Sequence, residues 1–120
     1  MESTSHFDAV WKGEWLLNFM ATASNLSLTA CRPGPVGYLL AEARDEERSR
    51  TPYLYVREVY VEEGSRLVGC GTALMHEASV QAARLHCVYL SIDVREGNLS
   101  SSFFNGLGFS AFSTRYRAKP

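Results

Sequence analysis

One glycine-rich segment in the middle of the chain has the residue types and spacing of an anion-binding loop. It follows a strand-like run that ends at Val61, and an apolar, helix-like run begins at Thr72. Gly69 and Gly71 permit a positive φ and let the backbone approach a bulky ligand closely. The start of a helix offers unpaired N–H groups and the positive end of the helix dipole. With the Arg66 guanidinium and the Thr72 hydroxyl beside them, these groups predict a loop that holds a phosphate or pyrophosphate.

Three kinds of nucleotide loop compete for these glycines. A Walker A loop needs a lysine after its second glycine, and Cys70 stands at that position. A Rossmann fingerprint needs a third glycine, and Leu74 stands in its place. The third pattern, R-x-x-G-x-G, fits the chain from Arg66 to Gly71. A glycine turn without any ligand is the remaining alternative, because such turns are common between elements.

The elements around the loop predict an α/β (α+β) fold with a mixed central sheet and helices on both faces. Hydrophobic spacing, turn residues and apolar runs place these elements along the chain. The order strand, loop, helix, strand in the middle implies a parallel crossover, while the preceding hairpins are antiparallel. The expected elements are helices over residues 5–23, 72–85 and 99–106 and strands over residues 26–32, 36–43, 53–61, 87–94 and 109–116.

Length and composition restrict the class of protein. The chain has 120 residues, of which 46% are hydrophobic and 21% charged, so we expect one globular domain over residues 1–120. The formal net charge is −1 and no apolar stretch has bilayer-spanning length, so neither nucleic acid nor a membrane is an expected partner. The first residues lack a secretory signal and the three cysteines form no CxxC pair. These features predict a cytoplasmic protein with free thiols and no metal site.

The R-x-x-G-x-G spacing and its context resemble the GNAT acetyltransferase superfamily. The family's loop follows a strand that ends in a valine five residues before the arginine, which is where Val61 stands. Downstream the family has an apolar strand, an asparagine, a short helix with aromatic residues and a Leu-Gly-Phe sequence. The matching features here are residues 87–94, Asn98, Phe103-Phe104 and residues 107–109. The resemblance covers roughly residues 26–118 and implies a GNAT acyl-CoA N-acyltransferase-like fold.

The resemblance implies an enzyme that takes acetyl-coenzyme A (acetyl-CoA) as co-substrate. The acetyl group would pass directly to a primary amine of a small molecule or a peptide, without a metal. The pyrophosphate would lie on the glycine loop, and the pantetheine arm would lie beside the strand over residues 53–61. The implied contact residues are Val59, Tyr60, Val61, Arg66, Leu67, Val68, Gly69, Cys70, Gly71, Thr72, Asn98 and Phe104.

Glu58 is the candidate general base. It is a carboxylate inside an otherwise apolar and aromatic strand, where loss of water makes it a stronger base for an ammonium proton. The alternative is a surface glutamate paired with Arg57 or another neighbour. Cys70 is a less favoured nucleophile, although a helix N-terminus acidifies thiols. His76 and His86 are expected on the surface.

Phe104 departs from the family pattern. Members often carry a tyrosine four residues before the glycine of Leu-Gly-Phe, and its hydroxyl protonates the departing thiolate. Phe104 keeps the ring without the proton, so solvent or another hydroxyl must replace it. Tyr60 is the second catalytic candidate for this reason, beside Ser100 and Ser101. A non-catalytic acyl-CoA-binding module is the alternative function, and a structural domain with an empty loop is the third.

The segment before residue 26 also departs from the pattern. Family members begin with a strand and two helices, whereas here only one helix over 5–23 fits, as in a short member with a truncated N-terminal region. A missing first strand leaves the strand over 26–32 as an open sheet edge, which natural proteins avoid. The helix carries more large apolar residues than one narrow stripe needs, with Trp11 and Trp15 on one stripe. We therefore expect a homodimer that covers this edge or this helix.

Overall fold

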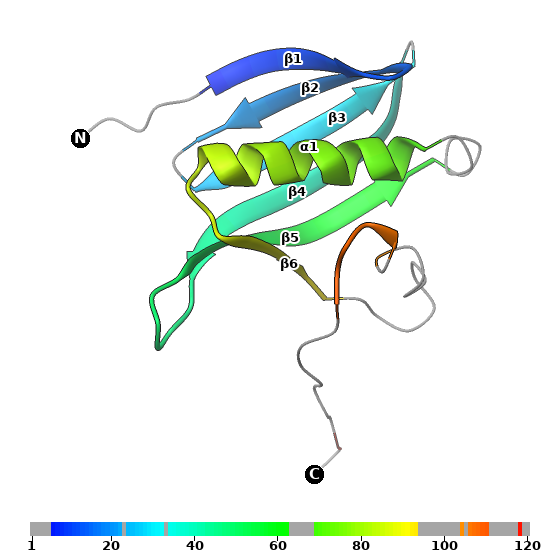
Figure 1. Ribbon diagram of the computed structural model, residues 1–120. Coiled ribbons are helices and arrows are strands. Elements are labelled where there is room, and N and C mark those ends of the chain that lie inside the picture. Colours follow the sequence, from blue (N-terminus) through cyan, green and yellow to red (C-terminus); the bar gives the residue numbers. More distant parts are fainter. Residues whose placement is uncertain are drawn as a thin grey trace.

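The computed structural model describes residues 6–22, 24–32, 34–62, 69–93, 104, 106–110 and 118. In these residues the chain forms one six-stranded sheet with an α-helix packed on one face (Figure 1). The strands lie in the sheet in chain order; β1 to β5 pair antiparallel and β6 pairs parallel with β5. The elements are β1 (His6–Lys12), β2 (Trp15–Ala21), β3 (Asn25–Cys31), β4 (Pro35–Asp45), β5 (Pro52–Val61), α1 (Cys70–Arg84) and β6 (Tyr89–Ile92).

The N-terminal segment is a β-hairpin, so the prediction of a helix over 5–23 is wrong. Lys12 lies opposite Trp15, and Gly13 and Glu14 form the two-residue turn between them. Gly13 has a φ of 61°, which glycine adopts without steric cost and which suits tight hairpin turns. Buried and exposed side chains alternate along β2, the period of a strand with one face in the core.

The two tryptophans consequently lie on opposite faces of the sheet, and the expectation of one shared stripe is wrong. Trp15 is 4% exposed and faces the core, whereas Trp11 is 67% exposed on the other face. The Arg32 guanidinium lies 5.3 Å from the centroid of the Trp15 ring. This cation–π contact covers the outer side of the buried indole.

The hairpin also fills the place beside β3 that was expected to be empty. β3 pairs with β2 on one side and with β4 on the other, so it is not a sheet edge. Only residues 22–24 connect β2 to β3. The two helices that family members place ahead of the following hairpin therefore have no counterpart between these strands.

The elements from β3 onward follow the predicted order. β3, β4, β5 and β6 lie within or close to the predicted strands, and α1 starts two residues before the predicted helix. Phe104 C=O accepts hydrogen bonds from the N–H groups of Leu107 and Phe109, both at 3.0 Å, and Gly108 has a φ of 91°. This is the C-terminal end of a helical turn. The rest of the predicted helix over 99–106 lies outside the described residues, as do residues 111–116 of the strand predicted over 109–116.

The core lies between α1 and one face of the sheet (Figure 1). Burial of each leucine there contributes about 1.5–3 kcal/mol to folding. We call the opposite face, which points away from α1, the open face; within the described residues no helix covers it, although helices on both faces were expected. No described helix is long and apolar enough to span a bilayer. The largest fully buried side chains are Leu17, Leu26, Leu28, Leu39, Leu54, Val56, Cys70 and Leu74.

Candidate functional site

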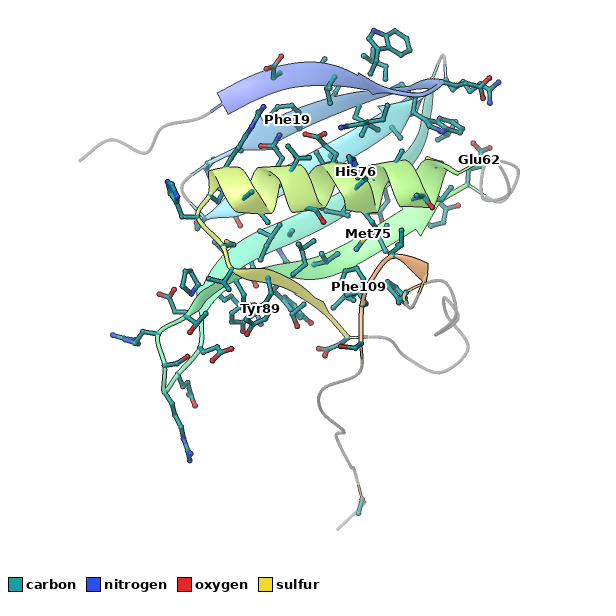
Figure 2. The ribbon with its side chains drawn as sticks, viewed as in Figure 1. Phe19, Glu62, Met75, His76, Tyr89 and Phe109 are labelled. Carbon is teal, nitrogen blue, oxygen red and sulfur yellow. The ribbon has the colours of Figure 1, made fainter. Side chains whose placement is uncertain are left out.

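The end of β5 and the start of α1 lie at the same end of the molecule (Figure 1). Figure 2 shows Glu62 just after β5, at this end. Gly69 caps α1 with φ 89° and ψ 14°, and no described side chain caps the helix or places a carboxylate in its first turn. The first helical bond runs from Ala73 N–H to Gly69 C=O, at 3.0 Å. The N–H groups of residues 70–72 therefore have no partner within the helix, as an anion site requires.

A glycine on β4 allows this helix start to pack close to the sheet. A Cβ built on Gly37 would lie 2.9 Å from the backbone oxygen of Tyr60 and 3.3 Å from the Cys70 Sγ. The Cys70 side chain is 0% exposed, and burial raises the pKa of its thiol. Burial of the thiol therefore argues against a nucleophilic role for Cys70, because it opposes the acidifying effect of the helix start. Cys70 can contribute its backbone N–H to a ligand.

A β-bulge interrupts β5 two-thirds of the way along the strand. Leu40 of β4 lies opposite Glu58, but the next residue, Ala41, lies opposite Val56. Arg57 is thus the extra residue on β5. Because a bulge suspends the alternation of a strand, Arg57 and Glu58 are both exposed as consecutive residues.

Beyond the bulge, β5 separates two sets of predicted site residues. Val59 and Val61 turn toward the core and α1, while Glu58 and Tyr60 point to the open face. Among the described residues, β6 pairs with β5 from Tyr53 to Val56. The segment expected to lie beside the pantetheine arm is thus the part of β5 that continues past the ladder with β6.

Glu58 lies in a small cluster with two tyrosines on the open face. Tyr38 of β4 lies directly opposite Tyr60, and their ring centroids are 5.7 Å apart at an interplanar angle of 33°. The Tyr38 hydroxyl donates a hydrogen bond to the Glu58 carboxylate, and this bond, with smaller contributions from burial and nearby charge, raises the pKa of Tyr38. Glu58 is exposed, as the surface alternative required, but its hydrogen-bond partner is Tyr38 rather than Arg57.

The sequence matches a known protein family. Residues 3–109 match the acetyltransferase (GNAT) family. The chain belongs to this family. No curated protein has a significant sequence match to it.

Solved structures share the GNAT fold at low sequence identity. An acetyltransferase from Trypanosoma brucei has a TM-score of 0.67 and 22% identity over 82% of this chain and 70% of its own. A putative acetyl transferase from Pyrococcus furiosus has a TM-score of 0.74 and 15% identity, over 80% of this chain and 66% of its own. AAC(6')-Iy, solved in complex with the bisubstrate analogue CoA-S-monomethyl-acetylneamine, has a TM-score of 0.68 and 19% identity. The match covers 81% of this chain and 71% of AAC(6')-Iy. These similarities confirm the GNAT fold.

The GNAT contact residues predicted from the sequence fall into three groups. Val59, Tyr60 and Val61 on β5 and residues 69–72 at the α1 start lie at one end of the fold. The side chain of Phe104 is 5% exposed and packs edge-on against Phe109, with ring centroids 5.6 Å apart. The predicted contact residues outside the described part of the chain are Arg66, Leu67, Val68 and Asn98.

Three features of the site went unrecognised in the sequence. Gly37 and Tyr38 were only members of a predicted strand, and the bulge at Arg57 was not foreseen. Once β4 is paired with β5, the alternation of side chains places Tyr38 on the same face as Glu58 and Tyr60. Knowledge of the β4–β5 register would therefore have revealed this neighbour. His76 and His86 are both exposed, as predicted, and Figure 2 shows His76 on α1.

Proposed function

We propose that this GNAT protein is an N-acetyltransferase that transfers an acetyl group from acetyl-CoA directly to a primary amine of a small molecule or peptide. The observation that carries the proposal is the α1 N-terminus, which no described side chain caps, beside the bulged end of β5, in a chain of this family. An anion-binding helix start and an exposed carboxylate then serve the two substrates from neighbouring elements.

The α1 start fits the coenzyme pyrophosphate. Gly69 has a positive φ that any side chain would strain, and the N–H groups of residues 70–72 are oriented as donors by the helix. The AAC(6')-Iy complex holds a CoA-based analogue, which supports the same co-substrate here. Acetyl-CoA supplies the activated acyl group as a thioester, while β5 near Val59 and Val61 orients its arm.

The open face supplies the group that removes the proton. An amine attacks only after losing the ammonium proton, and the Glu58 carboxylate can accept it directly or through water. The Tyr38 hydroxyl donates to this carboxylate and so orients it. Tyr60, 48% exposed beside Tyr38, is the described hydroxyl that we propose as proton donor to the leaving thiolate.

The proposal is tested by calorimetry with acetyl-CoA and by thiol release with a panel of primary amines. Binding with amine-dependent thiol release supports the enzyme. Binding without release from any amine supports the acyl-CoA-binding module instead, and no binding contradicts both.

Gly71→Val tests the pyrophosphate site. A branched side chain at the helix start should obstruct the approach of the anion and weaken acetyl-CoA binding at least about tenfold, or about 1.4 kcal/mol. Gly34→Val is the matched control, because Gly34 is an exposed turn residue with no atom near its built Cβ. Unchanged affinity in a folded Gly71→Val variant would contradict the assignment.

A further inference from the structure

A small cavity opens on the open face, directly beside the bulge. Its volume is about 170 Å³, enough for a carboxylate or phosphate group with a few further atoms. Leu40, which lies opposite Glu58, forms part of its wall, so the cavity adjoins the proposed general base. The lining residues used below are Met20, Thr22, Asn25, Ser27, Leu40 and Arg57.

Arg57 reaches this cavity because of the bulge. In a regular strand the side chains of residues 57 and 58 would point to opposite faces. The extra residue instead leaves both exposed, and Arg57 lines a cavity formed by open-face residues of β2, β3 and β4. Oppositely charged groups therefore lie on consecutive residues, whose Cα atoms are about 3.8 Å apart in any trans chain.

The neighbouring carboxylates interact with other groups, so the Arg57 guanidinium is available to a ligand. Glu58 accepts a hydrogen bond from Tyr38, and Glu42 of β4 accepts one from Arg44 Nε at 2.9 Å. The Arg57 guanidinium makes no ion pair or hydrogen bond with the side chain of any residue that the structure describes. The other polar groups at the cavity, on Thr22, Asn25 and Ser27, are neutral.

We propose that Arg57 binds an anionic group of the amine acceptor, so that the acceptor is a small amine that also carries a carboxylate or a phosphate. This proposal rests on the proposed N-acetyltransferase function. The ammonium lies at Glu58 and the anion lies in the cavity at Arg57, which matches both charges of one molecule. A guanidinium binds either anion through paired N–H donors, and the apolar walls of Met20 and Leu40 restrict the acceptor to a small size.

The kinetic test compares acceptors that differ only in the anionic group. The pairs are β-alanine with β-alaninamide, for a carboxylate, and O-phosphoethanolamine with ethanolamine, for a phosphate. In the wild type, kcat/KM for the anionic member of at least one pair should exceed that of its partner by at least about fivefold. The amide partner is the weaker base, so amine ionisation alone favours β-alaninamide, and a preference for β-alanine must come from the anion.

Arg57 variants assign the preference to the guanidinium. Arg57→Gln should remove it, mainly by raising KM for the anionic acceptor, and Arg57→Lys should retain part of it. Arg48→Gln, at the exposed β4–β5 hairpin tip, should leave both members of each pair unchanged. A wild type without any preference, or an Arg57→Gln variant that loses activity equally with both members, overturns the proposal.

A binding measurement separates this proposal from the proposed function. O-Phosphoethanolamine, β-alanine and their two partners are titrated into the protein, and the backbone amide signals of Asn25 and Ser27 are followed by NMR. Shifts induced by an anionic compound, absent with its partner and in Arg57→Gln, support the site even if no amine is acetylated. Absence of such shifts with both anionic compounds overturns it. Failure of acetyl transfer with every amine contradicts only the enzymatic function.

Discussion

At the scale of single residues, the site depends on the one residue that β5 inserts. Val56 faces the core, so a regular strand would also direct residue 58 to the core. A carboxylate there would lose its water without gaining a cation, which is costly. The insertion of Arg57 instead turns Glu58 to the open face, where Tyr38 can donate to it. The bulge thus leaves the glutamate exposed, as the proposed general base must be.

The Tyr38–Glu58 hydrogen bond can be tested without any substrate. The Glu58 carboxylate raises the pKa of Tyr38 because it stabilises the neutral phenol and repels the phenolate. Glu58→Gln should therefore lower the pKa of Tyr38, while Glu62→Gln, an exposed glutamate just after β5, should not. The measurement is the ultraviolet titration of tyrosinate, with Tyr38→Phe subtracted to isolate this residue. An unchanged titration in Glu58→Gln would show that the bond does not form.

A substitution at Phe104 tests whether the proposed reaction lacks a general acid for the leaving thiolate. Phe104→Tyr restores the hydroxyl that the family pattern places at this position, and general acid catalysis is worth roughly 10²–10⁴-fold in rate. A thiolate can leave unprotonated at neutral pH, so the wild type can react without this acid. We expect the added hydroxyl to make turnover faster with a good acceptor and to leave the acetyl-CoA affinity unchanged. The ring is 5% exposed, so thermal unfolding must confirm that the variant folds. If it is folded and no faster, position 104 does not serve the leaving sulfur or another group already does.

At the scale of elements, the sequence prediction failed at the N-terminus, where one spacing fits two structures. Phe7, Val10 and Trp11 follow helical spacing, yet β1 and β2 are strands. The turn signal was Gly13, because a glycine inside a helix is unfavourable, whereas it is favoured in a tight hairpin. The other strands were recognisable because prolines, glycines and long runs of Tyr and Val marked their bounds.

A buried ion pair joins the misread hairpin to α1. Glu77 is 2% exposed; Lys12 Nζ lies 3.3 Å from its Oε1, and Gln81 Nε2 donates to its Oε2 at 2.7 Å. Lys12→Met would leave this carboxylate buried beside a single amide, so urea unfolding should show a loss of about 1–3 kcal/mol. Adding Glu77→Leu should restore most of it, because the buried charge is then gone. A double variant as unstable as Lys12→Met alone would contradict this origin of the loss.

At the scale of the whole molecule, the sequence indicated which segments make the candidate site but not how they face one another. The glycine loop and Glu58 were found from local patterns, since each lies within a few residues of a strand end. Tyr38 and the cavity at Arg57 depend on the register between β4 and β5 and on the pairing of β2 with β3. Such non-local pairings leave no local signal, and the bulge that shifts the β4–β5 register is a single inserted residue.

The predicted homodimer cannot use the interface that the sequence suggested. The strand β3 is inside the sheet and the N-terminal helix does not exist, so neither can form the interface. The structure instead has β1 at the edge of the described sheet, with Trp11 67% and Met20 42% exposed on the open face nearby. An exposed strand edge and large exposed apolar side chains favour association. We therefore keep the prediction of a homodimer and place its interface at β1 and β2.

Sedimentation velocity at about tens of micromolar, a range suited to weak association, checks this prediction. The wild type should sediment as a dimer, and Trp11→Glu should shift it to the monomer, because a carboxylate at the interface must lose its water without a partner. Val88→Glu is the matched control: Val88 is 69% exposed, and it precedes β6 at the opposite edge of the described sheet. A monomeric wild type, or a dimer that Val88→Glu dissociates and Trp11→Glu does not, contradicts an interface at the N-terminal hairpin.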